Sequence, residues 1–425
     1  PTRVAVREEP MRRVSCLLIL PLVFASCGAA DELFPQAPDG QELDAGSSSL
    51  ADASAPQHDG STGLPPDAGL VPAPCELSAP LVHLEASSEP LAMGAFAIAD
   101  ALAGLAWSKD GLPRMLLFST DDGSLVADNP VHDLGALVPE ALDFGEGLFL
   151  LTGSTPAGGG SAYFDLAGAQ GATSPLADLW PMAVSRTVEG GLVLAYGRRP
   201  TSSSDSAVLG LWLEPDASVR DSVPFGTPAH QEVRWDLARS PSGEGIACGS
   251  SSDPNGAWLA LYAQGEQAVT AIPTAEKVAV LPEGEASFDC RIAVSESLRV
   301  VAFAETQGAP RVVWTAANGN VLAGPVPFLA AWRPAGQFDV AVREAATALA
   351  FFDNSSGAPR VSVRLFQTPG AEPVELRAEQ GLGLGSFVAQ RVRVERAGSD
   401  FFVAFDAVQP TGATHLVVRK VACSF

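Results

Sequence analysis

Four aspartates recur in the sequence at similar places, each directly after a bulky apolar residue. If these side chains converge in the fold, their carboxylates can hold a hard cation such as Ca²⁺ or receive a cationic group of a partner. The alternative is that each aspartate caps a turn by accepting hydrogen bonds from nearby backbone N–H groups. Repeated positions in repeat proteins are usually structural, so we expect capping and keep the cation site as the alternative. The four are Asp143, Asp236, Asp289 and Asp339.

Three tryptophans stand close to the same strands, at Trp180, Trp235 and Trp332. An exposed tryptophan with polar neighbours suits the stacking of a sugar ring or the centre of a protein interface. The alternative is that these side chains pack between repeated units, since tryptophan is usually well buried. Together with the four aspartates, they form the candidate binding face.

No other group of residues predicts catalysis. The five histidines, His58, His83, His132, His230 and His415, do not lie at metal-ligand spacing from one another or from a cysteine, so we expect no zinc site. The nucleophile-elbow and phosphate-loop motifs do not occur. We therefore assign no catalytic residue, and a protein that is not an enzyme is the favoured interpretation.

The elements that must position these residues are short strands. One apolar strand recurs about every 50 residues, which is close to the period of known propeller blades. A second strand follows each copy, and turn residues such as Asn318-Gly319 then close several hairpins. Seven units of about four strands predict an all-β, seven-bladed β-propeller; the competing architecture, two β-sandwich domains, should show two unlike blocks. The seven copies are Leu105–Trp107, Leu150–Thr152, Leu194–Tyr196, Ile246–Cys248, Val301–Phe303, Leu349–Phe351 and Val403–Phe405.

The last unit lacks a fourth strand, and the segment Pro80–Glu85 can supply it from the other end of the domain. Cys75 and Cys423 would then lie close together, and a disulfide between them would stabilise the ring by about 4–5 kcal/mol. Cys248 and Cys290 fall on neighbouring units. They form either a second disulfide or a pair of buried free thiols.

The N-terminal region has the features of an export signal. Arg12 and Arg13 precede the apolar stretch 17–24, which is too short to span a bilayer. The segment that ends at Cys27 reads Phe24-Ala25-Ser26-Cys27 and resembles a bacterial lipobox, which implies lipidation of Cys27; the alternative is cleavage without lipidation. We expect residues 1–26 to be an upstream extension and signal peptide, residues 27–74 a disordered acidic linker rich in Pro, Ala, Ser and Gly, and residues 75–425 the propeller.

Composition limits the possible partners. The chain of 425 residues has 26 basic and 49 acidic side chains, a net charge of -23, which argues against nucleic acid. It resembles lipoproteins with a propeller-like body from GC-rich Gram-negative bacteria. That resemblance implies a lipid-anchored protein of the outer membrane that faces the periplasm or the cell surface. We expect a monomer that binds or scaffolds an envelope protein or glycan, without a cofactor other than Ca²⁺. The alternatives are a polysaccharide hydrolase or lyase, and an outer-membrane assembly scaffold.

Overall fold

The computed structural model describes residues 75–423 with several gaps, and the chain divides into two units between Gly69 and Leu70. Every described residue belongs to the second unit. The predictions for Cys27, for the two segments up to residue 74 and for Trp332 lie outside the described residues. The gaps are 87–90, 156–157, 188–189, 197–207, 226–231, 240–244, 252–257, 265–268, 278–286, 306–309, 318–319, 329–337, 344–345, 354–359, 368–373, 378–387 and 410.

The described residues form strands and turns, and their strands pair into seven antiparallel sheets of four strands each. We call these sheets blades 1–7. Blades 1–3 contain β2 (Leu91–Ala99), β3 (Leu102–Lys109), β4 (Leu112–Ser119) and β5 (Leu125–Pro130); β6 (Val138–Gly145), β7 (Leu148–Thr155), β8 (Gly158–Asp165) and β9 (Gln170–Ala177); and β10 (Trp180–Thr187), β11 (Gly190–Tyr196), β12 (Val208–Leu213) and β13 (Val219–Phe225).

Blades 4–7 repeat the same pattern, except that blade 7 takes its fourth strand from the N-terminal side. They contain β14 (Glu232–Arg239), β15 (Gly245–Ser251), β16 (Trp258–Gln264) and β17 (Val269–Lys277); β18 (Ser287–Val294), β19 (Leu298–Glu305), β20 (Arg311–Ala316) and β21 (Val321–Pro327); β22 (Phe338–Arg343), β23 (Ala346–Asp353), β24 (Arg360–Gln367) and β25 (Val374–Arg377); and β26 (Val388–Ala397), β27 (Asp400–Val408), β28 (Thr414–Ala422) and β1 (Glu76–Ala86).

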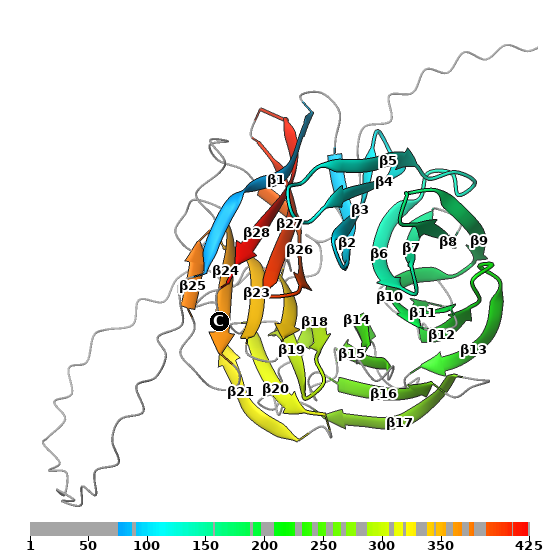
Figure 1. Cartoon of the computed structure of the whole chain (residues 1–425). Coiled ribbons are helices and arrows are strands. Elements are labelled where there is room, and N and C mark those ends of the chain that lie inside the picture. The colour runs from blue at the N-terminus through cyan, green and yellow to red at the C-terminus, as the bar shows by residue number, and fades with distance from the viewer. Residues whose placement is uncertain are drawn as a thin grey trace, which may run out of the picture. The chain divides into compact units, whose positions relative to one another are not determined.

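The blades are arranged in a ring, with the first strand of each blade on the inside (Figure 1). The first strand of each blade contacts the first strand of the next, and the last contact, between β26 and β2, completes the circle. The all-β, seven-bladed propeller predicted from the sequence is therefore confirmed.

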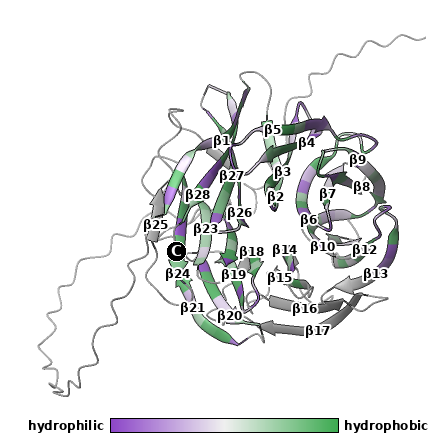
Figure 2. Ribbon diagram, in the orientation of Figure 1, coloured by the Kyte–Doolittle hydropathy of each residue, from purple (hydrophilic) through white to green (hydrophobic). Residues whose placement is uncertain are grey.

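The second strand of each blade carries the apolar repeat. All seven predicted copies lie in second strands, from β3 to β27. Leu105, Ala106 and Trp107 of β3 are buried, as are Leu349, Ala350 and Phe351 of β23. A strand that is covered on both faces is apolar throughout rather than alternating, because the neighbouring blades remove both faces from water. Hydrophobic stretches follow the strands around the ring in Figure 2.

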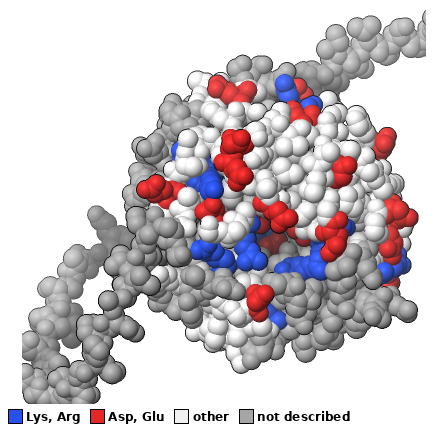
Figure 3. Space-filling model, viewed as in Figure 1, with Lys and Arg blue, Asp and Glu red and all other residues white. Residues whose placement is uncertain are grey.

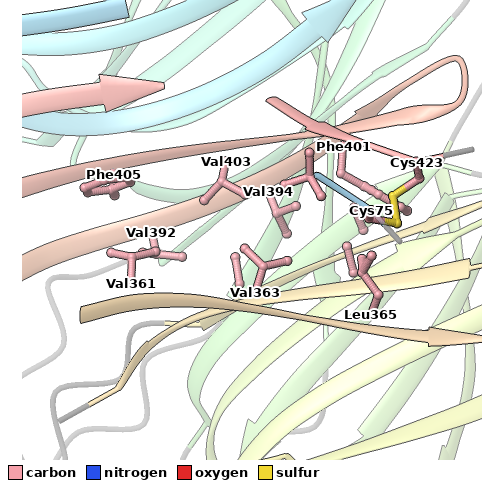
Figure 4. Packing of buried hydrophobic residues seen from close by; sticks show 14 of the residues in the cluster. Cys75, Val361, Val363, Leu365, Val392, Val394, Phe401, Val403, Phe405 and Cys423 are labelled. Carbon is pink, nitrogen blue, oxygen red and sulfur yellow. A yellow bond between two sulfur atoms is a disulfide. The ribbon is translucent and has the colours of Figure 1, made fainter. Parts of the chain in front are cut away.

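The ring is closed as the sequence predicted. β1 pairs antiparallel with β28, from Glu76 opposite Ala422 to Ala86 opposite Thr414, so the two ends of the domain share blade 7. A disulfide joins Cys75 to Cys423 at one end of this pair. Both cysteines belong to the apolar core between β24, β26 and β27, which Figure 4 shows from close by.

A second disulfide, between Cys248 of β15 and Cys290 of β18, joins blade 4 to blade 5. Both of its cysteines are buried. Two structural disulfides are typical of proteins that leave the reducing cytosol, so this is an exported protein. Within the described part of the chain, no helix is long and apolar enough to cross a bilayer.

Candidate functional site

The central channel holds a pocket of about 540 Å³ that is lined by the first strands of all seven blades. Acidic and basic side chains gather around the hollow on the face shown in Figure 3. The inner strands are edges of their sheets, so long polar side chains on them can reach the channel while their apolar neighbours pack between blades. The charged lining residues are Glu140, Asp143, Arg186, Asp236, Arg239, Arg291, Asp339, Arg393, Glu395 and Arg396.

Three of the four recurring aspartates line this pocket, but the four do not form one ring of carboxylates. Each aspartate can be located by the residue opposite it in the three-residue apolar repeat of the second strand. Asp143 lies opposite the first residue of its repeat, Leu150, and Asp339 lies opposite the middle residue, Ala350. Asp236 lies opposite the last residue of its repeat and Asp289 opposite the position after it. The four aspartates therefore pair with four different positions around the apolar repeats, and they are not equivalent in register.

The aspartates fasten one blade to the next. Asp143 Oδ2 accepts the backbone N–H of Arg186 at 2.6 Å, from blade 3. Asp236 Oδ2 accepts the N–H of Ile292 at 2.9 Å, from blade 5, and Asp339 Oδ2 accepts the N–H of Val394 at 2.9 Å, from blade 7. The expected role as acceptors of backbone N–H groups is thus present, but three of the four aspartates act across a blade boundary; Asp143 also accepts the N–H of its neighbour Phe144 at 2.8 Å.

Asp289 makes its hydrogen bond and its ion pair within its own strand. Its Oδ1 accepts the N–H of its own neighbour Cys290 at 3.0 Å and lies 3.9 Å from Nη2 of Arg291. Arg291 is 8% exposed, and burial alone would lower its pKa. The carboxylates of Asp289, Asp236 and Asp339 outweigh burial and raise it, so this guanidinium remains charged.

The guanidinium and carboxyl groups in this part of the channel shift one another's pKa values. Burial, together with the charge of Arg291, lowers the pKa of Arg393 to about 10. Burial raises the pKa of Asp339 to about 6, although Arg393 and Arg291 oppose the change. Burial and the nearby aspartates raise the pKa of Glu395 well above its ordinary value. At neutral pH, therefore, the arginines keep their charge while several carboxyls are close to losing theirs.

Two lining arginines present a donor that has no acceptor among the described residues. The Nε atoms of Arg239 and Arg291 are both buried and both without a hydrogen-bond partner. A buried N–H group that makes no hydrogen bond costs about 1–3 kcal/mol. Such donors, on a wall lined by further arginines and carboxyls, suit a ligand rich in oxygen acceptors and hydroxyl groups.

Of the three tryptophans of the candidate binding face, only the side chain of Trp180 is described, and it does not line this pocket. Trp180 is half-buried at the start of β10, and it is not among the described residues that line the pocket. Trp235 lies on β14, but its side chain lies outside the described residues, as does the whole of Trp332.

The charged residues Arg186, Arg291, Arg393 and Glu395 were not part of the predicted site. Their signal in the sequence is a charge inside an otherwise apolar first strand. In β18, for example, Asp289 and Arg291 alternate with Cys290 and Ile292. Side chains two apart on a strand share a face. Asp289 and Arg291 therefore lie on one face of β18, and Cys290 and Ile292 lie on the opposite face.

The sequence matches no protein-family model and no curated protein. Solved structures are similar in fold. The BP39L lectin from Burkholderia pseudomallei has a TM-score of 0.52 and 17% sequence identity, over 78% of this chain and 96% of that one. The polysaccharide lyase Uly1 has a TM-score of 0.51 and 10% identity, over 78% of this chain and 90% of that one. At these identities the likeness shows the fold, and the function has to be argued from the site.

Proposed function

We propose that this exported propeller is a binding module that takes an acidic glycan into its central channel. The observation that carries the proposal is that the buried Nε donors of Arg239 and Arg291, on the wall of a pocket of about 540 Å³, have no hydrogen-bond partner among the described residues. Sugar hydroxyls donate and accept hydrogen bonds, and a sugar carboxylate accepts them from guanidinium groups. A structural neighbour that is a lectin and another that is a polysaccharide lyase support the choice of a glycan over a protein.

The charges of the channel favour an acidic sugar over a neutral one. Five arginines and five carboxyl residues line the pocket. The pKa of Asp143 and that of Asp339 are raised to about 6, and the pKa of Glu395 is raised well above its ordinary value. The negative charge of the wall therefore weakens as the pH falls towards 6, whereas the arginines keep their charge.

Titration of the protein with oligosaccharides that contain uronic acid tests this proposal. We expect Arg393→Gln/Arg396→Gln to weaken binding at least tenfold by calorimetry, because both side chains line the pocket. The control Arg311→Gln, on the third strand β20 and not among the pocket's described lining residues, should bind as the wild type does. The dissociation constant of the wild type should fall about 3- to 10-fold between pH 8 and pH 5.5. Equal binding by both variants, or tighter binding at high pH, would contradict the proposal.

A glycan-cleaving enzyme is the second candidate. Raised carboxyl pKa values in a pocket are also typical of the general acids of glycoside hydrolases. Asp143 and Asp339, however, already accept backbone N–H groups from the next blade, so Glu395 is the candidate acid. Release of reducing or unsaturated ends from the same oligosaccharides, lost in Glu395→Gln, would establish this activity instead.

We also propose that the chain is anchored to the outer membrane through a lipid on Cys27. The lipobox-like segment before Cys27 supports this, and the linker 28–74, with its acidic Pro- and Ser-rich sequence, suits a tether between anchor and propeller. We expect the expressed protein to fractionate with membranes and Cys27→Ala to be released. Mass spectrometry of the mature N-terminus checks the modification. Equal membrane association of both proteins would exclude the anchor.

A further inference from the structure

Two histidines and a glutamate come together on the closing pair of strands. His83 and Glu85 lie two residues apart on β1, and His415 on β28 is directly opposite Glu85. Residues two apart on a strand share a face, and directly opposed residues in an antiparallel pair share it too. One ligand atom from each of the three side chains falls within 4.8 Å of the others.

The distance between the two imidazoles fits a metal ion. His83 Nε2 lies 3.2 Å from His415 Nδ1. Two nitrogens that bind one tetrahedral Zn²⁺ at 2.0–2.1 Å are about 3.3 Å apart. The carboxylate of Glu85 is at the exposed end of a flexible side chain, so it can turn towards the same point.

His415 is the buried member of the trio. His415 is 0% exposed, and its Nε2 atom is buried without a hydrogen-bond partner among the described residues. Burial lowers the pKa of His415, with His83 acting in the same direction and Glu85 opposing it. His83 and Glu85 are exposed, so an ion can enter from solvent.

We propose that His83, Glu85 and His415 bind Zn²⁺ and that the ion fastens β1 to β28. Two imidazoles and a carboxylate form a donor set that Zn²⁺ prefers, whereas Ca²⁺ prefers oxygen ligands alone. The Cys75–Cys423 disulfide closes one end of this strand pair, and the trio lies towards the other end, near Ala86 opposite Thr414. The ring would thus be clasped at both ends of one strand pair. This site is independent of the channel and of the ligand proposed for it.

The test is a Zn²⁺ titration of the full chain, prepared without a polyhistidine tag, against a chromogenic chelator. We expect one site of micromolar or tighter affinity, weakened at least tenfold in His83→Ala and in Glu85→Gln. Both residues are exposed, so these variants should fold; His132→Ala, an exposed histidine elsewhere, is the matched control and should bind as the wild type does.

Thermal unfolding gives a second readout. Saturating Zn²⁺ should raise the midpoint of the wild type and of His132→Ala by about 3–8 °C. It should not raise the midpoint of His83→Ala, and Ca²⁺ should not act on any of the three proteins. No Zn²⁺ bound at micromolar concentration, or equal binding by wild type and His83→Ala, would overturn the proposal and leave a histidine–histidine hydrogen bond at this position.

Discussion

Replacing Cys75 and Cys423 together with alanine is expected to lower the free energy of unfolding of the oxidised protein by about 5 kcal/mol. The two cysteines are 348 residues apart, so their disulfide closes nearly the whole propeller into one loop. A cross-link stabilises mainly by restricting the unfolded chain, and the effect grows with the logarithm of the loop length. In the folded state, the same bond holds β1 in the sheet of blade 7.

The second disulfide provides a matched control. Cys248 and Cys290 are only 42 residues apart, and their bond joins neighbouring blades instead of the two ends of the ring. The same loop argument gives about 4 kcal/mol for Cys248→Ala/Cys290→Ala. Urea unfolding of both variants, followed by tryptophan fluorescence, measures the difference. If the short-loop variant loses as much stability as the long-loop variant or more, closure of the ring is not what Cys75 and Cys423 contribute.

The architecture could be predicted because its strongest signal is a strand covered on both faces. The apolar triplets, such as the buried Leu349-Ala350-Phe351, recur about every 50 residues, so they can be recognised in the sequence. The fourth strands gave almost no signal, because they form the outer edge of each blade. Leu125 and Val126 of β5 are 63% and 46% exposed, and β21 is similarly open to solvent. A strand edge that faces solvent tolerates many residue types, so the positions of the fourth strands become clear only once the whole ring is known.

The site could be predicted only in part, because its geometry depends on register. The sequence showed that aspartates recur on the first strands, but not which residue of the second strand each one faces: Asp143 lies opposite the first residue of its apolar repeat, and Asp236 lies opposite the last. The trio of His83, Glu85 and His415 was missed for a different reason. His83 and His415 are 332 residues apart, and they meet only in the exact register of β1 on β28.

Arg186 is the residue whose loss from the channel wall should cost most. It is 2% exposed, and it connects three blades. Its Nε and Nη2 atoms donate to the carbonyl oxygen of Gly145 in blade 2 at 3.3 and 3.1 Å, and Nη1 donates to Gly190 in its own blade. Its own carbonyl oxygen accepts Nη1 of Arg239 from blade 4 at 3.1 Å.

The guanidinium also lies 5.0 Å from the ring centre of Tyr163, an arrangement that stabilises a cation over an aromatic face. Burial lowers the pKa of Arg186, and the neighbouring Tyr163 and Asp143 oppose that change. A residue so placed is structural. It joins blades 2, 3 and 4 at the wall of the pocket, so we assign it no part in the proposed ligand binding.

We therefore expect Arg186→Met to lower the free energy of unfolding by about 3–5 kcal/mol at pH 8, since it leaves the carbonyl oxygens of Gly145 and Gly190 without these donors and removes a positive charge that stabilises ionised Asp143. Arg396→Met, an exposed arginine of the same channel, should cost less than about 0.5 kcal/mol. Urea unfolding at fixed pH measures both.

The pH dependence separates lost charge pairing from lost packing. Burial raises the pKa of Asp143 in the folded protein to about 6, above its ordinary value of 3.8. A carboxyl group whose pKa is raised on folding favours the folded state when protonated, so its contribution is present at low pH and disappears as the pH rises through 6. Without Arg186, the pKa of Asp143 should rise further, and ionisation of Asp143 should destabilise the folded state more. The loss caused by Arg186→Met should therefore be larger at pH 8 than at pH 5, whereas an equal loss at both would assign it to packing alone.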